Sequence, residues 1–193
     1  MDAKPSASSR RELTKSQNRE IILEAARLVF AQLGFATATV RDIIRATPLA
    51  SGTFYNYFKS KEQVYQALRD EEALAVRPRL RQARATATTA QEFVAANFRA
   101  FFWFVAEKGG TGGDRFRLDS PEVLAGFAEL REDIERAMAR GLLPPNDAGL
   151  LTAALTGVAF ELAEEVKRGA EVEKVTQFAT DLLLGGIGVP PKT

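Results

Sequence analysis

The sequence predicts an all-α protein, and three observations indicate that class. Strand-like alternation of β-branched residues is almost absent. Alanine, leucine, glutamate and arginine, which favour helices, dominate the chain. Apolar residues recur at the three- to four-residue spacing that places them on one face of a helix. With 193 residues, of which 46% are hydrophobic and 26% charged, the chain is long enough to bury a core.

The N-terminal helices begin at recognisable capping sequences. Residues 14–17 have the form of a capping box and open the first helix, which Gly34 ends. Residues 39–42 repeat this signature and open a short second helix, which Pro48 stops. Ser51 is expected to cap a third helix. Each of the first two helices has an apolar stripe: Ile22, Ala25, Ala26, Val29 and Leu33, and then Val40, Ile43 and Ile44.

The later helices follow the same rules. Ser60 is expected to cap a fourth helix, which Pro78 kinks or ends. The glycine-rich residues 109–113 break the next helix. The expected C-terminal helices span residues 89–108, 120–140, 146–169 and 171–184.

Composition narrows the function. The chain has no cysteine and no histidine, which removes the common zinc ligands, the thiolate nucleophile and the usual general base at neutral pH. We therefore expect no enzymatic activity, no catalytic residue, no metal and no cofactor. The N-terminal residues lack the apolar stretch of a signal peptide, and no run approaches the length of a membrane span. A cytoplasmic protein without membrane contact is expected.

Residues 51–58 contain four aromatic side chains in five positions. Phe54 and Phe58 lie on one helical face and meet the apolar stripe of the second helix, so we expect them in the core. Asn56 lies on the opposite face, bordered by Tyr55 and Tyr57. Two short helices joined by a tight turn are typical of a helix-turn-helix, whose second helix enters the DNA major groove. A purely structural helical hairpin has the same geometry.

Charge is uneven along the chain. The first 70 residues carry 11 Lys and Arg against 7 Asp and Glu, although the net charge of the whole chain is only +1. A basic segment favours a polyanionic partner, although a solvated face of this charge is also common.

Residues 17–65 resemble the DNA-binding domain of the tetracycline-repressor (TetR/AcrR) family of bacterial transcriptional regulators. The stretch TVRDIIRATPLASGTFYNYFKSKEQVYQAL carries the resemblance, because several motif elements keep their register along it. The remainder of the chain agrees with that family in length and helical content. The resemblance implies an N-terminal three-helix helix-turn-helix domain followed by a C-terminal helical ligand-binding and dimerisation domain.

The resemblance also implies roles for individual residues. Thr39 corresponds to a phosphate contact and Arg41 to a base contact. The base-proximal face comprises Ser51, Gly52, Thr53 and Asn56, and the backbone contacts are Tyr55, Tyr57, Lys59 and Lys61. Two positions depart from the family pattern. Pro48 replaces a usual glycine in the turn, and Tyr57 replaces a frequent histidine.

These expectations define three segments. Residues 1–12 form a flexible basic and serine-rich tail, residues 13–62 the DNA-binding domain, and residues 63–193 the effector-binding and dimerisation domain. The expected function is that of a sequence-specific DNA-binding transcriptional regulator, a repressor released from its operator by a small apolar or amphipathic ligand. The alternative is an all-helical small-molecule carrier or an enzyme acting in an aromatic pocket.

Aromatic residues surround the helix expected over 89–108, which predicts burial on every side. This helix is either solid core or one wall of an apolar effector pocket. Asn97 is the best polar candidate inside such a pocket. The candidate pocket residues are Phe93, Asn97, Phe101, Phe104, Phe127 and Phe160.

Residues 147–168 carry two apolar stripes instead of one. Leu151, Leu155, Val158 and Leu162 can face the protein's own core, so the second stripe needs another partner. We expect a homodimer that binds a palindromic double-stranded operator, because a two-fold pair of recognition helices can read two half-sites. The candidate interface residues are Leu150, Ala154, Gly157, Val175, Phe178 and Leu182.

Overall fold

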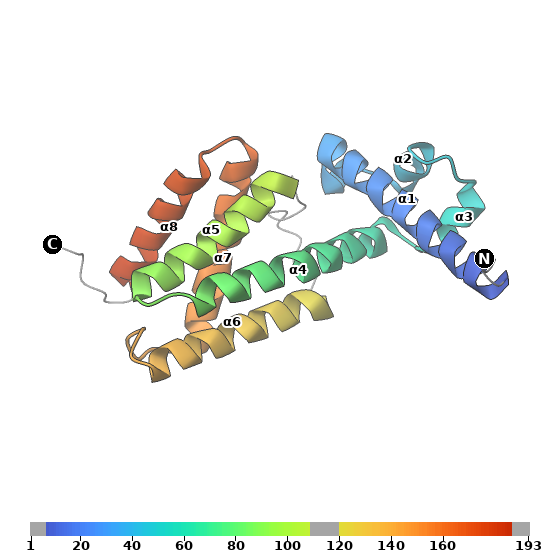
Figure 1. Cartoon of the computed structure of the whole chain (residues 1–193). Coiled ribbons are helices and arrows are strands. Elements are labelled where there is room, and N and C mark those ends of the chain that lie inside the picture. Colours follow the sequence, from blue (N-terminus) through green and yellow to red (C-terminus); the bar gives the residue numbers. More distant parts are fainter. Residues whose placement is uncertain (1–6, 109–119, 187–193) are drawn as a thin grey trace, which may run out of the picture. The chain divides into compact units, whose positions relative to one another are not determined.

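The computed structural model describes residues 7–108 and 120–186, and these ranges contain eight helices and no strand (Figure 1). The all-α prediction is therefore confirmed. The helices are α1 Ala7–Thr37, α2 Val40–Arg45, α3 Ser51–Tyr55, α4 Lys61–Ala85, α5 Ala90–Lys108, α6 Pro121–Ala139, α7 Ala148–Lys167 and α8 Val172–Gly186. Within the described ranges, no helix is both long and apolar enough to span a bilayer.

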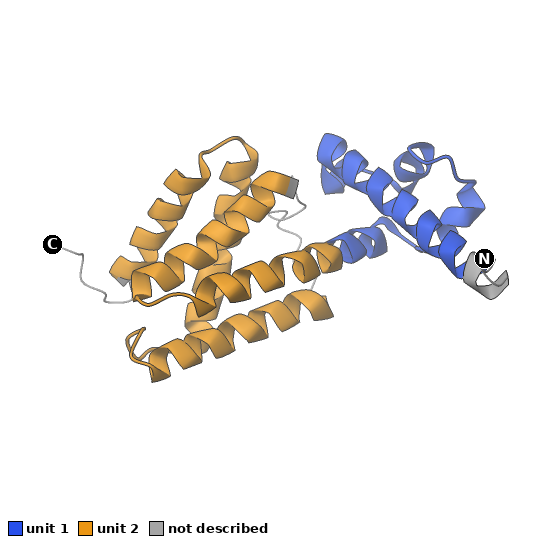
Figure 2. Ribbon diagram, viewed as in Figure 1, with its two compact units in different colours: residues 1–68 blue, residues 69–193 orange. Residues whose placement is uncertain are grey.

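The chain divides into two compact units, coloured separately in Figure 2. Unit 1 comprises residues 1–68 and unit 2 residues 69–193. The sequence placed this division at residues 62–63, at the start of α4. In the structure α4 contributes its first two turns to unit 1 and its remaining residues to unit 2.

Helix α1 begins at Ala7, so the expectation of a helix start at residues 14–17 is wrong. The reason is that residues 7–13 include the good helix formers arginine and leucine and no proline or glycine that would stop a helix. Residues 1–6 of the expected tail lie outside the described residues. Gly34 interrupts the helix as predicted, with a φ of 71° that an L side chain adopts only with strain.

The core of unit 1 joins α1, α2, α3 and the start of α4. Phe54 and Phe58 are only 1% and 6% exposed, which confirms that they belong to the core. Ile43 of α2 is also fully buried, whereas Val40 and Ile44 are half-buried. A second aromatic group consists of Phe30, Phe35 and Tyr65, whose ring centroids lie 4.6–5.8 Å apart.

Unit 2 is a helical bundle in which α5 packs against α7 and α8, and α6 packs against α7. Its core contains Phe93, Phe98 and Phe102, which are at most 1% exposed. The sequence predicted that α5 is buried on every side. That prediction is wrong at Trp103, which is 48% exposed. Its indole Nε1 donates a 3.4 Å hydrogen bond to Glu173 of α8, which also accepts from Arg99 at 3.0 Å.

Several helix ends differ from the expectations. Helix α4 continues through Pro78 to Ala85, because the carbonyl that loses its partner there lies on an exposed side of the helix that water can reach. Asp147, one residue after the expected Asn146, caps α7 by accepting from the backbone N–H of Leu150 at 2.8 Å. Ser120 caps α6 as predicted. The glycine-rich residues 109–113 lie outside the described residues.

Candidate DNA-contact surface and ligand pocket

Helix α3 presents small polar side chains to solvent because its large apolar ones are buried. Ala50 is the N-cap residue and makes no side-chain cap, so Ser51 is the first helical residue and not the cap that the sequence suggested. Ser51 and Gly52 are exposed, and Tyr55 is 57% exposed. Asn56 is the C-cap residue, with its side chain in solvent.

The predicted DNA-contact residues all lie in unit 1, from the N-cap residue of α2 through α3 to the first residue of α4. Among residues 39–61 the only acidic side chain is Asp42, so the segment as a whole is basic. Seven of the predicted residues are exposed, namely Thr39, Arg41, Ser51, Gly52, Tyr55, Asn56 and Lys59, and three are half-buried, namely Thr53, Tyr57 and Lys61.

Thr39 is occupied by a capping box at the start of α2. Its Oγ1 donates to Asp42 Oδ2 at 2.6 Å and accepts from the Asp42 backbone N–H at 3.3 Å. The backbone N–H of Thr39 donates to the same carboxylate at 3.0 Å. These hydrogen bonds from the Thr39 side chain and backbone hold the pKa of Asp42 below its ordinary value. The hydroxyl oxygen of Thr39 therefore has a fixed orientation.

Lys61 closes the C-terminal end of α1. Its ammonium group donates to the backbone carbonyls of Phe35, Ala36 and Ala38 at 2.8, 3.1 and 2.9 Å. An ammonium has three protons, so these carbonyls account for all its donors. A contact between Lys61 and a DNA phosphate would require at least one of these bonds to break.

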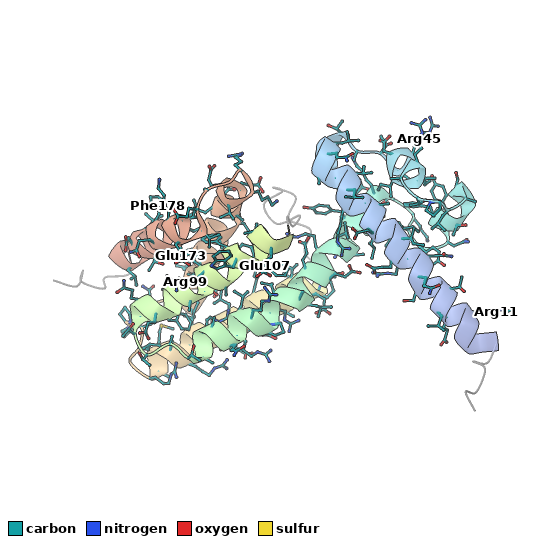
Figure 3. The ribbon with its side chains drawn as sticks, turned by 45° about the horizontal axis from the view of Figure 1, so that its top comes forward. Arg11, Arg45, Arg99, Glu107, Glu173 and Phe178 are labelled. Carbon is teal, nitrogen blue, oxygen red and sulfur yellow. The ribbon has the colours of Figure 1, made fainter. Side chains whose placement is uncertain are left out.

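Arg45 is a candidate DNA contact that the sequence analysis did not identify. It lies in the last turn of α2, four residues after Arg41 and therefore on the same helical face. Its side chain is exposed and extends away from α2 (Figure 3). The spacing of the two arginines was the signal that could have identified it.

Unit 2 contains a pocket bounded by α4, α5, α6 and α7. The cavity is about 100 Å³, and about 870 Å³ of non-protein space lies between its walls when the open mouth is included. Five of the six predicted pocket residues line it, namely Asn97, Phe101, Phe104, Phe127 and Phe160. Phe93 does not line the pocket; its side chain is 1% exposed and belongs to the core cluster of unit 2.

Charged residues of α4 and α6 also line the pocket, and the sequence did not single them out. Arg77 donates to Glu122 at 2.9 Å and also to Glu129. The hydrogen bond between Arg77 and Glu129 raises the pKa of the arginine and lowers that of the carboxyl group. The partners are 45 and 52 residues apart in sequence, so no local pattern links them.

Arg84 is the most deeply buried charge of the pocket, with 3% of its surface exposed. Its Nε donates to Asp133 at 2.7 Å and its Nη1 to the Asn97 side chain at 2.9 Å. Burial lowers the pKa of Arg84, and the hydrogen bond to Asp133 acts in the opposite direction.

The second apolar stripe of α7 is exposed together with part of α8. Leu150, Phe178 and Leu182 are 70%, 59% and 54% exposed (Phe178 is labelled in Figure 3). Ala154 is exposed and Gly157 half-buried, and a Cβ added at Gly157 would have open space around it beyond its own helix backbone. Val175, which was also expected at this surface, is 8% exposed and belongs to the core.

Together these features define a class of protein: a helix-turn-helix unit joined by a shared helix to a helical bundle that holds a pocket. Residues 22–68 match the family model described as bacterial regulatory proteins, tetR family. Over these residues the N-terminal unit is therefore similar to the tetR family, as its sequence motif indicated.

Solved structures share the fold over nearly the whole chain. FadR from Bacillus subtilis in complex with stearoyl-CoA is 20% identical, with a TM-score of 0.72 over 89% of this chain and 99% of that one. A tetR-family regulatory protein from Rhodococcus RHA1 is 19% identical, with a TM-score of 0.73 over 90% and 98%. RolR in complex with resorcinol is 22% identical, with a TM-score of 0.67 over 92% and 91%.

Proposed function

We propose that this protein is a homodimeric transcriptional regulator that binds a DNA operator through unit 1 and is released by a small ligand held in unit 2. The observation that carries the proposal is the exposed polar face of α3, within a unit that matches the tetR family model. Such a regulator acts as a repressor in the cytoplasm, where its operator DNA lies.

Base reading is assigned to the exposed face of α3. The Asn56 side chain can donate a hydrogen bond to the edge of an adenine and accept one from it at the same time. Ser51 adds a hydroxyl in the first turn of α3. Gly52 lets the backbone approach the groove closely because it has no side chain. Arg45 and Lys59 supply exposed positive charge for the phosphates, and the exposed Arg41 is kept as a base contact.

The assignment is tested by selecting duplexes from a randomised library with the purified protein and measuring mobility shifts. A palindrome should be enriched. Asn56→Ala should lower the preference for the selected site over a mismatched one by about 1–3 kcal/mol. Asn146→Ala, the same change in a loop of unit 2, is the control and should have no effect. Absence of any enriched sequence would contradict DNA-specific binding and favour the carrier or enzyme hypothesis.

The ligand is assigned to the pocket of unit 2. FadR is described with stearoyl-CoA and RolR with resorcinol, so proteins of this fold accept ligands of very different size and charge. Helix α4 begins in unit 1 and lines this pocket with residues 69–84. If DNA and the ligand prefer different positions of α4, each weakens the binding of the other by the same coupling free energy. That coupling cannot exceed the difference in the ligand's binding free energy between the two positions.

The dimer is assigned to the exposed apolar residues of α7 and α8. Large side chains such as Leu150 and Phe178 are seldom exposed together without a partner, and the small Ala154 and Gly157 allow two helices to approach closely. A two-fold pair could read half-sites one DNA turn, about 34–36 Å, apart.

Phe178→Arg tests this interface, because it replaces a 59% exposed aromatic side chain of that surface with a charge. We expect a folded monomer by light scattering, with operator affinity reduced about a hundredfold or more. Leu124→Arg, at an exposed leucine of α6, is the matched control and should remain dimeric. A wild-type protein that is monomeric while binding a palindrome tightly would contradict the dimer.

A further inference from the structure

The formal charges around the unit 2 pocket cancel. Three arginines and three glutamates line it: Arg69, Arg77, Arg84, Glu72, Glu122 and Glu129. Every one of these arginines has a carboxylate within 4 Å. The rest of the lining is mostly apolar, so the field inside the pocket comes from paired charges and not from a surplus of either sign.

The pairs on α4 and α6 leave no uncompensated guanidinium for an anion. Arg77 is held between Glu122 and Glu129, and Glu129 also accepts from Arg81 at 2.8 Å. A carboxylate ligand that approached Arg77 would meet both glutamates at similar distance. Because like charges repel more strongly in a poorly solvated pocket than in water, such a ligand would have to displace one of them.

The guanidinium of Arg84 is also occupied by partners within the protein. Its Nε and Nη2 both lie 2.7 Å from Asp133 Oδ2, and its Nη1 contacts Asn97. Asp133 itself accepts from Arg136 as well. A buried, hydrogen-bonded ion pair is costly to break, because the separated charges lose their partners without regaining water.

A cationic ligand is disfavoured by the position of Arg69. Its guanidinium carbon lies 5.4 Å from the centroid of the Phe160 ring, so the face of that ring already holds a cation. The remaining ring surfaces form an aromatic corner: Phe160 packs edge-on with Phe101 and Phe127, with centroids 5.6 and 6.1 Å apart. Aromatic rings pack favourably against such edges and faces.

The size of the cavity sets the size of the ligand. Its volume is about 100 Å³. An apolar cavity of about 150 Å³ holds benzene, so small movements of the lining side chains suffice for one ring. The Glu122 side chain at the wall is 38% exposed, so the charged part of the lining stays in contact with solvent.

From this balance of charge, aromatic lining and volume we infer that the pocket selects a neutral aromatic molecule of about one ring and rejects carboxylates, coenzyme A thioesters and organic cations. The inference deepens the proposed function, because it names the chemical class of the ligand that the regulator senses.

The first test compares probes of the same size and different charge on the full wild-type chain without DNA. Methyl benzoate, benzoate, benzylammonium and stearoyl-CoA are titrated, with saturation-transfer NMR for the small probes and calorimetry for the thioester. We expect methyl benzoate to bind at least about tenfold more tightly than either charged ring, and stearoyl-CoA not to bind. Equal or tighter binding of benzoate or stearoyl-CoA, or no binding of the ester, would overturn the inference.

The second test changes the charge balance. Glu122→Gln together with Glu129→Gln leaves Arg77 without a carboxylate partner, so benzoate should gain about tenfold in affinity relative to methyl benzoate. Glu165→Gln, which removes an exposed carboxylate paired with Arg168 at 2.6 Å on α7, is the control and should leave the ratio unchanged. The single Glu122→Gln variant serves if the double variant is unstable. An unchanged ratio in both pocket variants would contradict the assignment.

Because these measurements contain no DNA, they separate the two proposals. A protein that binds the ester with the expected charge preference, yet binds no DNA sequence specifically, supports the ligand class and contradicts the regulator. A protein that selects a palindrome but prefers benzoate supports the regulator and contradicts the ligand class.

Discussion

The ammonium nitrogen of Lys61 lies 2.8 Å from the carbonyl oxygen of Phe35 and 4.7 Å from the centroid of the Phe35 ring. This contact joins the first residue of α4 to the end of α1, where helical carbonyls lack partners within the helix. A positive charge is also favourable there, because the C-terminal end of a helix carries partial negative charge. Lys61 therefore stabilises the DNA-contact unit from within.

Lys61→Met should lower the free energy of unfolding of unit 1 by about 1–3 kcal/mol, because it removes three hydrogen bonds from a charged donor. Lys59→Met, two residues earlier at an exposed side chain, should change stability by less than about 0.5 kcal/mol. If Lys59 contacts a phosphate, its loss should also reduce the slope of log affinity against log salt by about one.

Both variants are compared by chemical denaturation and by operator titration over a range of salt. Loss of salt dependence without loss of stability in Lys61→Met would instead place its ammonium on DNA, as the family resemblance implies.

Gly126→Ala should stabilise unit 2. Gly126 lies inside α6, where glycine costs about 0.5–1 kcal/mol relative to alanine. An added Cβ would lie 3.7 Å from the aliphatic carbons of Arg77, an ordinary contact. Gly34→Ala is the opposite case, because its φ of 71° disfavours any side chain, and should destabilise unit 1 by about 1–2 kcal/mol. Thermal denaturation measures both; a loss of stability in Gly126→Ala would refute the packing argument.

Acid should weaken the start of α2. The pKa of Asp42 is lowered in the folded state, so its contribution to stability is present above the ordinary value of 3.8 and is lost as the pH falls through the lower folded value. Asp42→Asn should therefore reduce the acid sensitivity of unit 1 below about pH 4 and have its largest destabilising effect at neutral pH. The test is to measure the free energy of unfolding of the wild type and of Asp42→Asn from neutral pH into acid. A constant difference between the two proteins at every pH would rule out the proposed role of Asp42.

Arg84→Met should destabilise unit 2 by about 3–5 kcal/mol, because it leaves the Asp133 carboxylate without its buried partner. Replacing both residues, with Asp133→Leu added, should recover much of that loss. A double-mutant cycle by denaturation measures the coupling. Additive losses would mean that the two charges do not depend on each other.

The helices themselves were predictable because their signals are local. The spacing of Phe54 and Phe58 placed both in the core, and the capping box at Thr39 is present in the structure. The start of α1 was predicted wrongly. No residue in 7–13 opposes a helix, so the helix begins before the capping sequence at residues 14–17.

The candidate sites were predictable only in part. The sequence identified five aromatic or amide residues of the pocket but not Arg77 and Arg84, whose carboxylate partners on α6 are 45 to 52 residues away. Likewise Lys61 and the carbonyls that it binds are 23 to 26 residues apart. Contacts of this kind depend on how helices pack, which residue spacing alone does not determine.

The indole of Trp103, bound to Glu173 on the surface between α5 and α8, is the chain's single tryptophan. All three tyrosines, Tyr55, Tyr57 and Tyr65, belong to unit 1. Fluorescence excited at the long-wavelength edge, where tyrosine does not absorb, therefore reports on unit 2 alone, whereas tyrosine emission originates only in unit 1. The unlabelled protein thus contains a separate optical probe for each unit, and the order in which the two units unfold can be observed directly.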